Sequence, residues 1–231
     1  MIQTEGRVYE QRGVVYVKTS RPAVDNLSDE VTVIWQDNRS RTAEQNRKAW
    51  ALMSEIADYQ GQEKESTYKE QALAFTDKSM EILQGRLFHL STATVSEASA
   101  FITMLVELIV ENGIPTKQPL YTLCEDVEKY TYACLINKKC CVCGLKAELH
   151  HCDGSRIGMG YNRETKPQLG AMVLPLCRVH HTEYHTIGGT AFGEKYHVVA
   201  VPMDKKIAQR YHISGDALRE RTDDRLQANS W

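Results

Sequence analysis

The stretch ELHHCDG, residues 148–154, places two histidines side by side, and LCRVHHTEYH, residues 176–185, adds three more. Five of the chain's eight histidines therefore lie in one short region, which also contains CCVCG at residues 140–144. Imidazoles and thiolates are the preferred protein ligands of zinc and related transition metals. How many metal ions these side chains hold decides both the fold and the function expected of this region.

Two pairs of residues with matching spacing predict one structural zinc site. Cys140 and Cys143 are separated by two residues and followed by a glycine, which allows a tight turn to aim both thiolates at one point. Cys177 and His180 have the same spacing and complete a Cys3His tetrahedron. The alternatives are that the first two cysteines are buried thiols without a metal, or that Cys141 replaces Cys140 as a ligand.

The remaining histidines form a second pattern. His181 and His185 are four residues apart, so on a helix they share one face and can bind a single metal. His150 and His151 are adjacent, and consecutive side chains of a strand point to opposite faces. One of the two can therefore face a metal while its neighbour faces elsewhere.

This division of histidines suits phosphodiester hydrolysis. A metal stabilises charge on the phosphorus centre and the leaving oxygen, and a separate neutral imidazole takes a proton from water near pH 7. The alternative is that all five histidines bind structural zinc or lie on a solvated helix.

The motifs CCVCG, ELHHCDG and LPLCRVHHTEYHTIG, within residues 138–188, resemble those of the HNH, or ββα-metal, endonucleases that phages encode with an added zinc knuckle. The resemblance implies that His150 is the first metal ligand, His151 the general base, and His181 and His185 the ligands from the helix. It also implies a catalytic divalent metal, which is magnesium, manganese, nickel or zinc. By ligand type alone, three histidines favour a transition metal over magnesium.

One position departs from that family. HNH endonucleases usually have an asparagine five residues before the position of Cys177, where it pins the loop between the two strands, and this chain has Met172 there. A methionine side chain cannot replace the hydrogen bonds of an amide. We therefore expect either that another residue, such as Asn162, holds the loop, or that the base is less well positioned.

Other cysteines and basic residues of this region have simpler expected roles. Cys124 and Cys134 lie in a helical pattern and are expected to be ordinary buried thiols, and Cys152 is expected in the core or beside the metal ligands. Four basic side chains are candidates for phosphate contacts, although each could equally be a solvated surface charge; they are Arg178, Arg156, Lys138 and Lys139.

The first part of the chain is expected to combine a small antiparallel sheet with helices. Apolar and polar residues alternate in RVYEQRGVVYVKTS and EVTVIWQD, within residues 5–37, which is typical of half-buried strands. From Thr42 the period becomes helical and ends near Gly61, and a second helix is expected at about 66–83. A capping box predicts a core helix from Thr94 to Gly113, and a further helix is expected at about 123–137.

Beyond the cysteine cluster the pattern is a short strand, a glycine-rich loop, the strand AMVLPL and a helix. A strand-like HVVAVP and a helix near 204–212 follow. We therefore expect an α+β protein with two domains. The first, residues 1–135, has a net charge of -6, and the second, residues 136–231, is a zinc-stabilised ββα-metal module with a net charge of +4. The second domain is the better partner for a polyanion.

The segments RTAEQNRKAWALMSEIADYQG and LSTATVSEASAFITMLVELIVENGIP resemble parts of the lambda-type phage Orf (NinB) recombination mediators, in element order over most of residues 1–120. The resemblance implies binding of single-stranded DNA, contact with host single-strand-binding protein, and a homodimer. Four basic residues near Trp35 and Trp50 suit phosphate contacts and base stacking; they are Arg39, Arg41, Arg47 and Lys48. The alternative is that Trp50 lies in the core and that these charges are solvated.

The expected function is that of a metal-dependent DNA endonuclease from a phage or prophage, acting on recombination or replication intermediates. The main alternative is a recombination mediator that keeps zinc and DNA affinity without cleavage, and a zinc-dependent transcription factor is a weaker third. No apolar run approaches the roughly 20 residues that span a bilayer, so we expect a protein of the bacterial cytoplasm.

Overall fold

The computed structural model describes residues 6–11, 14–19, 39–152, 154 and 166–219, in two compact units that comprise residues 1–36 and 37–231. In the first unit, strands β1 (Gly6–Gln11) and β2 (Val14–Thr19) form an antiparallel hairpin in which Val8 lies opposite Val17. The hairpin confirms the expected strands of residues 7–19, and the strand expected within residues 30–37 lies outside the described residues.

Three helices begin the second unit: α1 (Ala43–Gln60), α2 (Lys64–Lys78) and α3 (Val95–Asn112). The expected capping box is present at Thr94, whose side chain accepts a hydrogen bond from the backbone three residues on. Thr42 forms a second capping box at the start of α1, which the sequence analysis did not predict. Gly61 and Gly113 end α1 and α3 in the left-handed conformation that glycine adopts without strain. The first and third helices are therefore where the sequence predicts them.

The second helix is shorter than its pattern predicted. It ends at Lys78, since Ser79 has left helical geometry with φ of -119° and ψ of 24°, and the Ser79 N–H is shared between the carbonyls of Phe75 and Thr76. A turn with Gly85 in the left-handed conformation follows instead of the expected last helical residues.

Aromatic and aliphatic side chains fill the space between these helices. The ring of Phe101 packs against those of Phe75 and Phe88, with centroid distances of 5.4 and 4.7 Å. Leu52 and Ile56 of α1 are fully buried in the same cluster. Trp50 is half-buried and packs against Tyr68 rather than lying free for base stacking.

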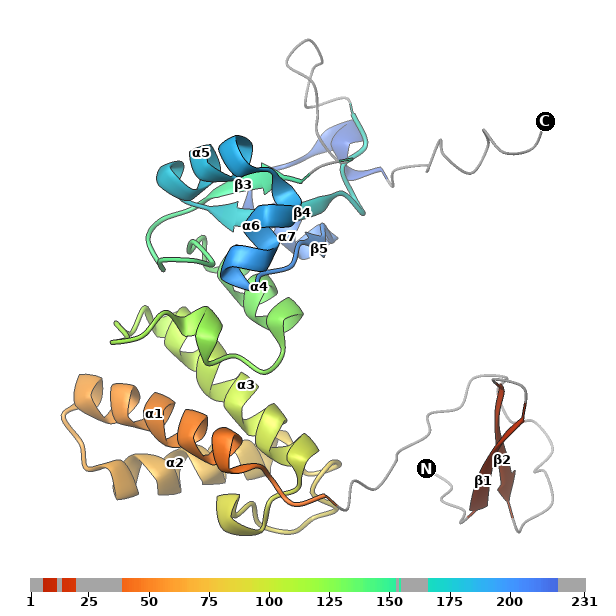
Figure 1. The fold of residues 1–231 in the computed structure, drawn as a ribbon, viewed down its shortest axis with the longest axis vertical. Helices are drawn as coiled ribbons and strands as arrows, with labels where there is room; N and C mark the ends of the chain where they lie inside the picture. The colour runs from red at the N-terminus through yellow and green to blue at the C-terminus, as the bar shows by residue number, and fades with distance from the viewer. Residues whose placement is uncertain (1–5, 12–13, 20–38, 153, 155–165, 220–231) are drawn as a thin grey trace. The chain divides into compact units, whose positions relative to one another are not determined.

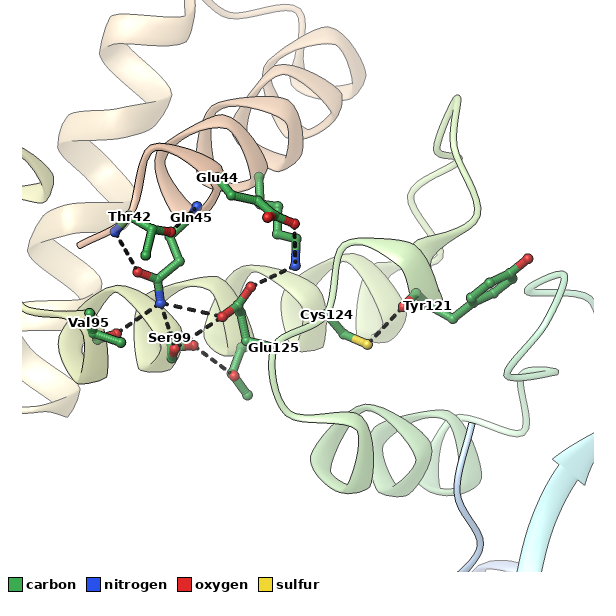
Figure 2. Close-up of polar contacts among 10 residues, drawn as sticks. Thr42, Glu44, Gln45, Val95, Ser99, Tyr121, Cys124 and Glu125 are labelled. Carbon is green, nitrogen blue, oxygen red and sulfur yellow. Dashed lines mark hydrogen bonds and ion pairs between the residues drawn. The ribbon is translucent and has the colours of Figure 1, made fainter. Parts of the chain in front are cut away.

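A polar network joins α1, α3 and the segment that leads into the next helix (Figure 2). The Gln45 side-chain amide donates to the Val95 carbonyl at 3.1 Å and to Ser99 Oγ at 2.9 Å. Glu125 accepts from Ser99 Oγ at 3.2 Å and from Lys48 Nζ at 2.7 Å. These contacts satisfy polar groups that the helix packing buries.

Helix α4 (Val127–Ile136) connects this helical part to a small sheet (Figure 1). It begins at Asp126, whose carboxylate accepts from the backbone N–H of Lys129, and it packs against α3 on one side and against the sheet on another. It starts later than the expected residue 123 because Asp126 is its N-cap, and the short 3-10 turn η2 (Leu120–Thr122) lies before it.

The sheet has the antiparallel order β3 (Glu148–His151), β4 (Met172–Leu176) and β5 (Val201–Pro202). Both faces of β4 are buried, since Val173 belongs to one apolar cluster while Leu174 and Leu176 belong to another. The remaining elements follow in chain order: α5 (Arg178–Ile187), α6 (Gly189–Tyr196), α7 (Lys205–Arg210) and the 3-10 turn η3 (Gly215–Leu218), with η1 (Leu90–Thr92) earlier in the chain.

The mixed α+β class is thus confirmed for the described part of the chain. One apolar cluster includes side chains on both sides of residue 136, from Phe101 of α3 to Leu176 of β4. The division into domains 1–135 and 136–231 stays a prediction. Among the described residues, none of the helices combines the length and apolar character that crossing a membrane requires.

Replacing Phe101 with alanine should lower the free energy of unfolding by about 3–5 kcal/mol, because the change removes a buried ring between two other rings. Urea unfolding followed by circular dichroism measures this loss. Leu73 of α2 is largely exposed, so Leu73→Ala is the matched control and should change stability by no more than about 0.5 kcal/mol. Equal losses for the two variants would contradict the assigned core.

Candidate metal centre and active site

A cluster of three cysteines and one histidine joins the chain before β3 to the start of α5. The ligand atoms of Cys140, Cys143, Cys177 and His180 all lie within 4.8 Å of one another. Cys143 Sγ is 3.7 Å from Cys177 Sγ, and His180 Nδ1 is 3.5 Å from Cys140 Sγ and 3.2 Å from Cys177 Sγ. The structure therefore brings together all four residues predicted to hold structural zinc.

The local backbone explains why these thiols converge. The N–H of Cys140 donates to the Leu145 carbonyl at 2.7 Å, and the N–H of Gly144 donates to the Cys140 carbonyl at 2.9 Å. Gly144 has a φ of 70°, which a residue with a side chain adopts only with strain. Cys177 is the N-cap of α5, so its thiol and the His180 ring in the first turn point to the same side.

The distances between these atoms fit a zinc ion. Zinc bonded to sulfur at about 2.3 Å and to nitrogen at about 2.0 Å in a tetrahedron separates two sulfurs by about 3.8 Å, and sulfur from nitrogen by about 3.5 Å. The observed separations of 3.7, 3.5 and 3.2 Å lie close to those values. The cluster can therefore bind zinc with little movement of its side chains.

The cysteines differ in how readily they form thiolates. Burial would raise the pKa of Cys177, but backbone N–H groups of His180 and Val179 and the Cys143 thiol favour its thiolate, and its pKa is lowered overall. Burial raises the pKa of Cys141 well above its ordinary value and that of Cys134 to about 12. Cys140, and not Cys141, belongs to the group whose ligand atoms converge, which argues against Cys141 as the ligand in its place.

A second cluster lies between β3 and α5. Potential ligand atoms of His150, His181 and His185 also lie within 4.8 Å of one another. The ring centroid of His150 is 4.6 Å from that of His181 and 5.0 Å from that of His185, and His150 is only 2% exposed. These three are the residues that the HNH resemblance assigns to the catalytic metal.

Two neighbours shape this second cluster. The buried Tyr184 ring of α5 packs against His150 at a centroid distance of 4.2 Å. His181 Nδ1 is buried and has no hydrogen-bond partner among the described residues, and a carboxylate oxygen of Glu148 is 3.6 Å away. A metal ion would satisfy such a buried nitrogen, so the three-histidine set fits a transition metal on this observation.

His151 has different surroundings from its neighbour His150. It is half-buried, and its Nε2 lies 3.1 Å from Oε1 of Gln168, in the segment that precedes β4. The alternation of side chains along β3 thus separates the two adjacent imidazoles, as strand geometry requires. One imidazole belongs to the three-histidine cluster and the other contacts an amide.

Three residues near the two histidine sites were not predicted from the sequence. Glu148 precedes His150 by two residues, so strand alternation alone could have placed both on one face. Tyr184 follows His181 by three residues on α5, so helical spacing could have found it. No spacing rule connects His151 with Gln168, because the two are 17 residues apart and Gln168 lies outside the strand that carries His151.

Met172 does not replace the missing asparagine through its side chain, which is 38% exposed. Its backbone carbonyl accepts from the N–H of Cys152 at 2.9 Å, one residue beyond β3, so it extends the pairing of the two strands. Cys152 itself is buried, as expected. Asn162, the proposed substitute, lies outside the described residues.

The basic residues proposed to contact phosphates near the clusters differ in their surroundings. Arg178 is exposed on the first turn of α5, next to Cys177. Lys138 lies with its Nζ 5.3 Å from the centre of the Tyr211 ring, and Lys139 pairs with Lys146 in an isolated bridge. Arg156 lies outside the described residues. Arg178 directly follows Cys177 and Lys139 directly precedes Cys140, so both adjoin the Cys3His cluster in the chain.

The basic residues before and within α1 are partly engaged with the protein. Lys48 binds Glu125, and Glu44 lies 3.5 Å from the same ammonium. Arg41 Nε donates to the Leu90 carbonyl, while Arg39 and Arg47 are exposed. Their part in DNA binding stays a prediction, and the charge of Lys48 is already balanced by carboxylates.

Comparison with known proteins identifies a family. A family model described as "Putative HNHc nuclease" matches residues 17–213, which is most of the chain and includes both clusters. No curated protein and no solved structure matches the chain significantly.

Cys143→Ser should abolish binding of the structural zinc, because serine cannot supply a thiolate to the tetrahedral site. Zinc content per chain, measured by inductively coupled plasma mass spectrometry after dialysis, reports the loss. Cys124→Ser is the matched control, since Cys124 is a buried thiol outside the cluster, and it should keep the zinc. Retention of zinc by both variants would refute the assigned ligand set.

His181→Ala should weaken binding of a second divalent ion while leaving the structural zinc in place, because the two clusters share no residue. Isothermal titration of zinc-loaded protein with manganese or nickel measures the affinity. His89→Ala removes an exposed histidine outside both clusters and serves as control. Equal affinities for the two variants would count against a second metal site at His150, His181 and His185.

Proposed function

The chain belongs to this family of HNH nucleases, and from that membership we propose that it is a metal-dependent DNA endonuclease that hydrolyses phosphodiester bonds. The observation that carries the proposal is the separation of His150 from His151. The first lies with His181 and His185, and the second lies outside that cluster. A purely structural metal site has no use for the additional imidazole.

In the proposed mechanism the protein supplies both a metal site and a base. A divalent metal held by His150, His181 and His185 would stabilise negative charge at the phosphorus centre and on the leaving 3′ oxygen. His151 accepts a proton from the attacking water, and the oxygen of that water forms a bond to phosphorus as the bond to the 3′ oxygen breaks. The products then carry 5′-phosphate and 3′-hydroxyl ends.

The structural zinc would act at a distance from the reaction. Cys140 and Cys143 precede β3, while Cys177 and His180 begin α5, so one ion would link the two elements that carry the metal-binding histidines. This link would fix the separation of β3 and α5, on which the geometry of the second cluster depends. The exposed Arg178 on the same turn is suitably placed for contact with a DNA phosphate.

We further propose a biological setting for the protein. We assign the protein to a phage or prophage and to the cytoplasm of the bacterial host, where it would act on single-stranded or branched recombination and replication intermediates. Residues 1–135, by their likeness to Orf mediators, would bring it to such DNA, through contact with single-strand-binding protein and as a homodimer. The exposed Arg39 and Arg47 support a local DNA contact there.

The second candidate function is that of a recombination mediator that binds DNA and does not cleave it. The exposed Met172 favours this function, because it stands where HNH endonucleases usually have an asparagine. Such a protein would keep zinc and bind DNA, and it would lack turnover. Both candidates bind DNA, so a binding experiment alone does not separate them.

His151→Ala should reduce cleavage by about 10²–10⁴-fold, because it removes the proton acceptor and leaves both ligand sets intact. The experiment compares wild type and variant on supercoiled plasmid and on circular single-stranded DNA, with magnesium, manganese or nickel. Zinc content and melting temperature should be unchanged. If neither protein cuts under any metal while both bind DNA, the mediator function replaces the nuclease.

A further inference from the structure

The contact between His151 and Gln168 determines which ring nitrogen of His151 carries hydrogen. A neutral imidazole has one N–H donor and one lone pair, while an amide oxygen only accepts hydrogen bonds. Because Oε1 of Gln168 lies 3.1 Å from Nε2 of His151, the hydrogen belongs on Nε2. The lone pair that can take a proton from water is then on Nδ1.

Gln168 is itself held firmly in position. Its side chain is only 4% exposed, and its backbone N–H donates to the carbonyl of Ala217 in η3 at 2.9 Å. Its own carbonyl accepts from the N–H of Ala171 at 3.0 Å, and Leu169 beside it is buried in the apolar cluster beneath β4. An amide fixed in this way can orient a neighbouring ring without losing much further conformational freedom.

We propose that Gln168 is a positioning residue, which holds His151 in the Nε2–H tautomer and presents Nδ1 as the proton acceptor. The proposal rests on the proposed nuclease function, and it identifies what orients the base in a chain with Met172 at the position of the usual asparagine. The amide acts through His151 and does not touch the reacting atoms. Partners that orient active-site histidines through their second nitrogen are a general feature of such sites.

The first test separates a positioning role from a structural one. Gln168→Leu has a similar volume without an acceptor, so kcat should fall by about 10–100-fold while KM, zinc content and melting temperature stay near wild type. Gln168→Glu keeps an acceptor at the same reach and should retain most of the activity. If the leucine and glutamate variants lose activity equally, or if only stability changes, the proposal is overturned.

A double-mutant cycle with His151→Ala sharpens this test. If Gln168 acts only through His151, then Gln168→Leu should have no further effect on the residual cleavage of His151→Ala. A full additional loss in the double variant would show that Gln168 contributes independently, which contradicts the proposal.

The second test does not depend on cleavage. Nitrogen-15 correlation spectra of the histidine rings distinguish Nε2–H from Nδ1–H, in zinc-loaded protein at a pH where the rings are neutral. We expect Nε2–H for His151 in wild type and in Gln168→Glu, and a mixture of tautomers in Gln168→Leu. Nδ1–H in wild type would mean that the Gln168 amide donates instead, and would overturn the proposal.

The two tests also distinguish failure of the inference from failure of the proposed function. Active wild type with an unaffected Gln168→Leu variant would remove Gln168 from the mechanism and keep the nuclease. If the wild type is inactive and still shows the Nε2–H tautomer, Gln168 orients the His151 ring, but His151 is not a catalytic base. That result would overturn the proposed positioning role.

Discussion

The convergence of three thiols and one imidazole between the chain before β3 and the start of α5 is the constraint on which the site depends. Neither element is long, since β3 has four residues and α5 has ten. Short elements pack weakly by themselves, so their relative placement needs a further link. The Cys140, Cys143, Cys177 and His180 set provides the ligands for one, close to the residues that carry His150 and His181. Zinc in such a site contributes directly to folding free energy.

Apolar packing then supports this arrangement from two sides. Strand β4 lies between β3 and β5 and buries side chains on both faces. Helix α4 packs against α3, β4 and α7, so the helical part and the sheet are in continuous contact through it. Polar groups between α1, α3 and the segment before α4 are satisfied by the Gln45 and Glu125 network. The metal-binding side chains therefore extend from a packed scaffold, which suits a site that needs fixed geometry.

Local chemistry made much of the fold predictable from sequence. Thr94 with Glu97, and Gly113 after the last turn, gave correct limits for α3, because caps and left-handed glycine act within a few residues. Both Cys/His clusters were predictable since their ligands occur at spacings dictated by turns and helices. Contacts between residues far apart in the chain were not predictable. Lys48 binds Glu125 across 77 residues, and Gln168 contacts His151 across 17 residues, so no periodicity connects the partners of either pair. Helix α2 ends earlier than predicted because Ser79 leaves helical geometry, and the spacing of apolar residues does not signal this change.

The pairing of β3 with β4 also determines on which face of the sheet each of the two adjacent histidines lies. His150 lies opposite Leu174 and His151 opposite Val173. A shift of this register by one residue would exchange the faces of the two imidazoles, because side chains of a strand alternate with a period of two. The metal ligand and the second histidine would then trade places although every residue remained present. The pairing register of this four-residue strand thus decides which imidazole can reach the metal ligands of α5.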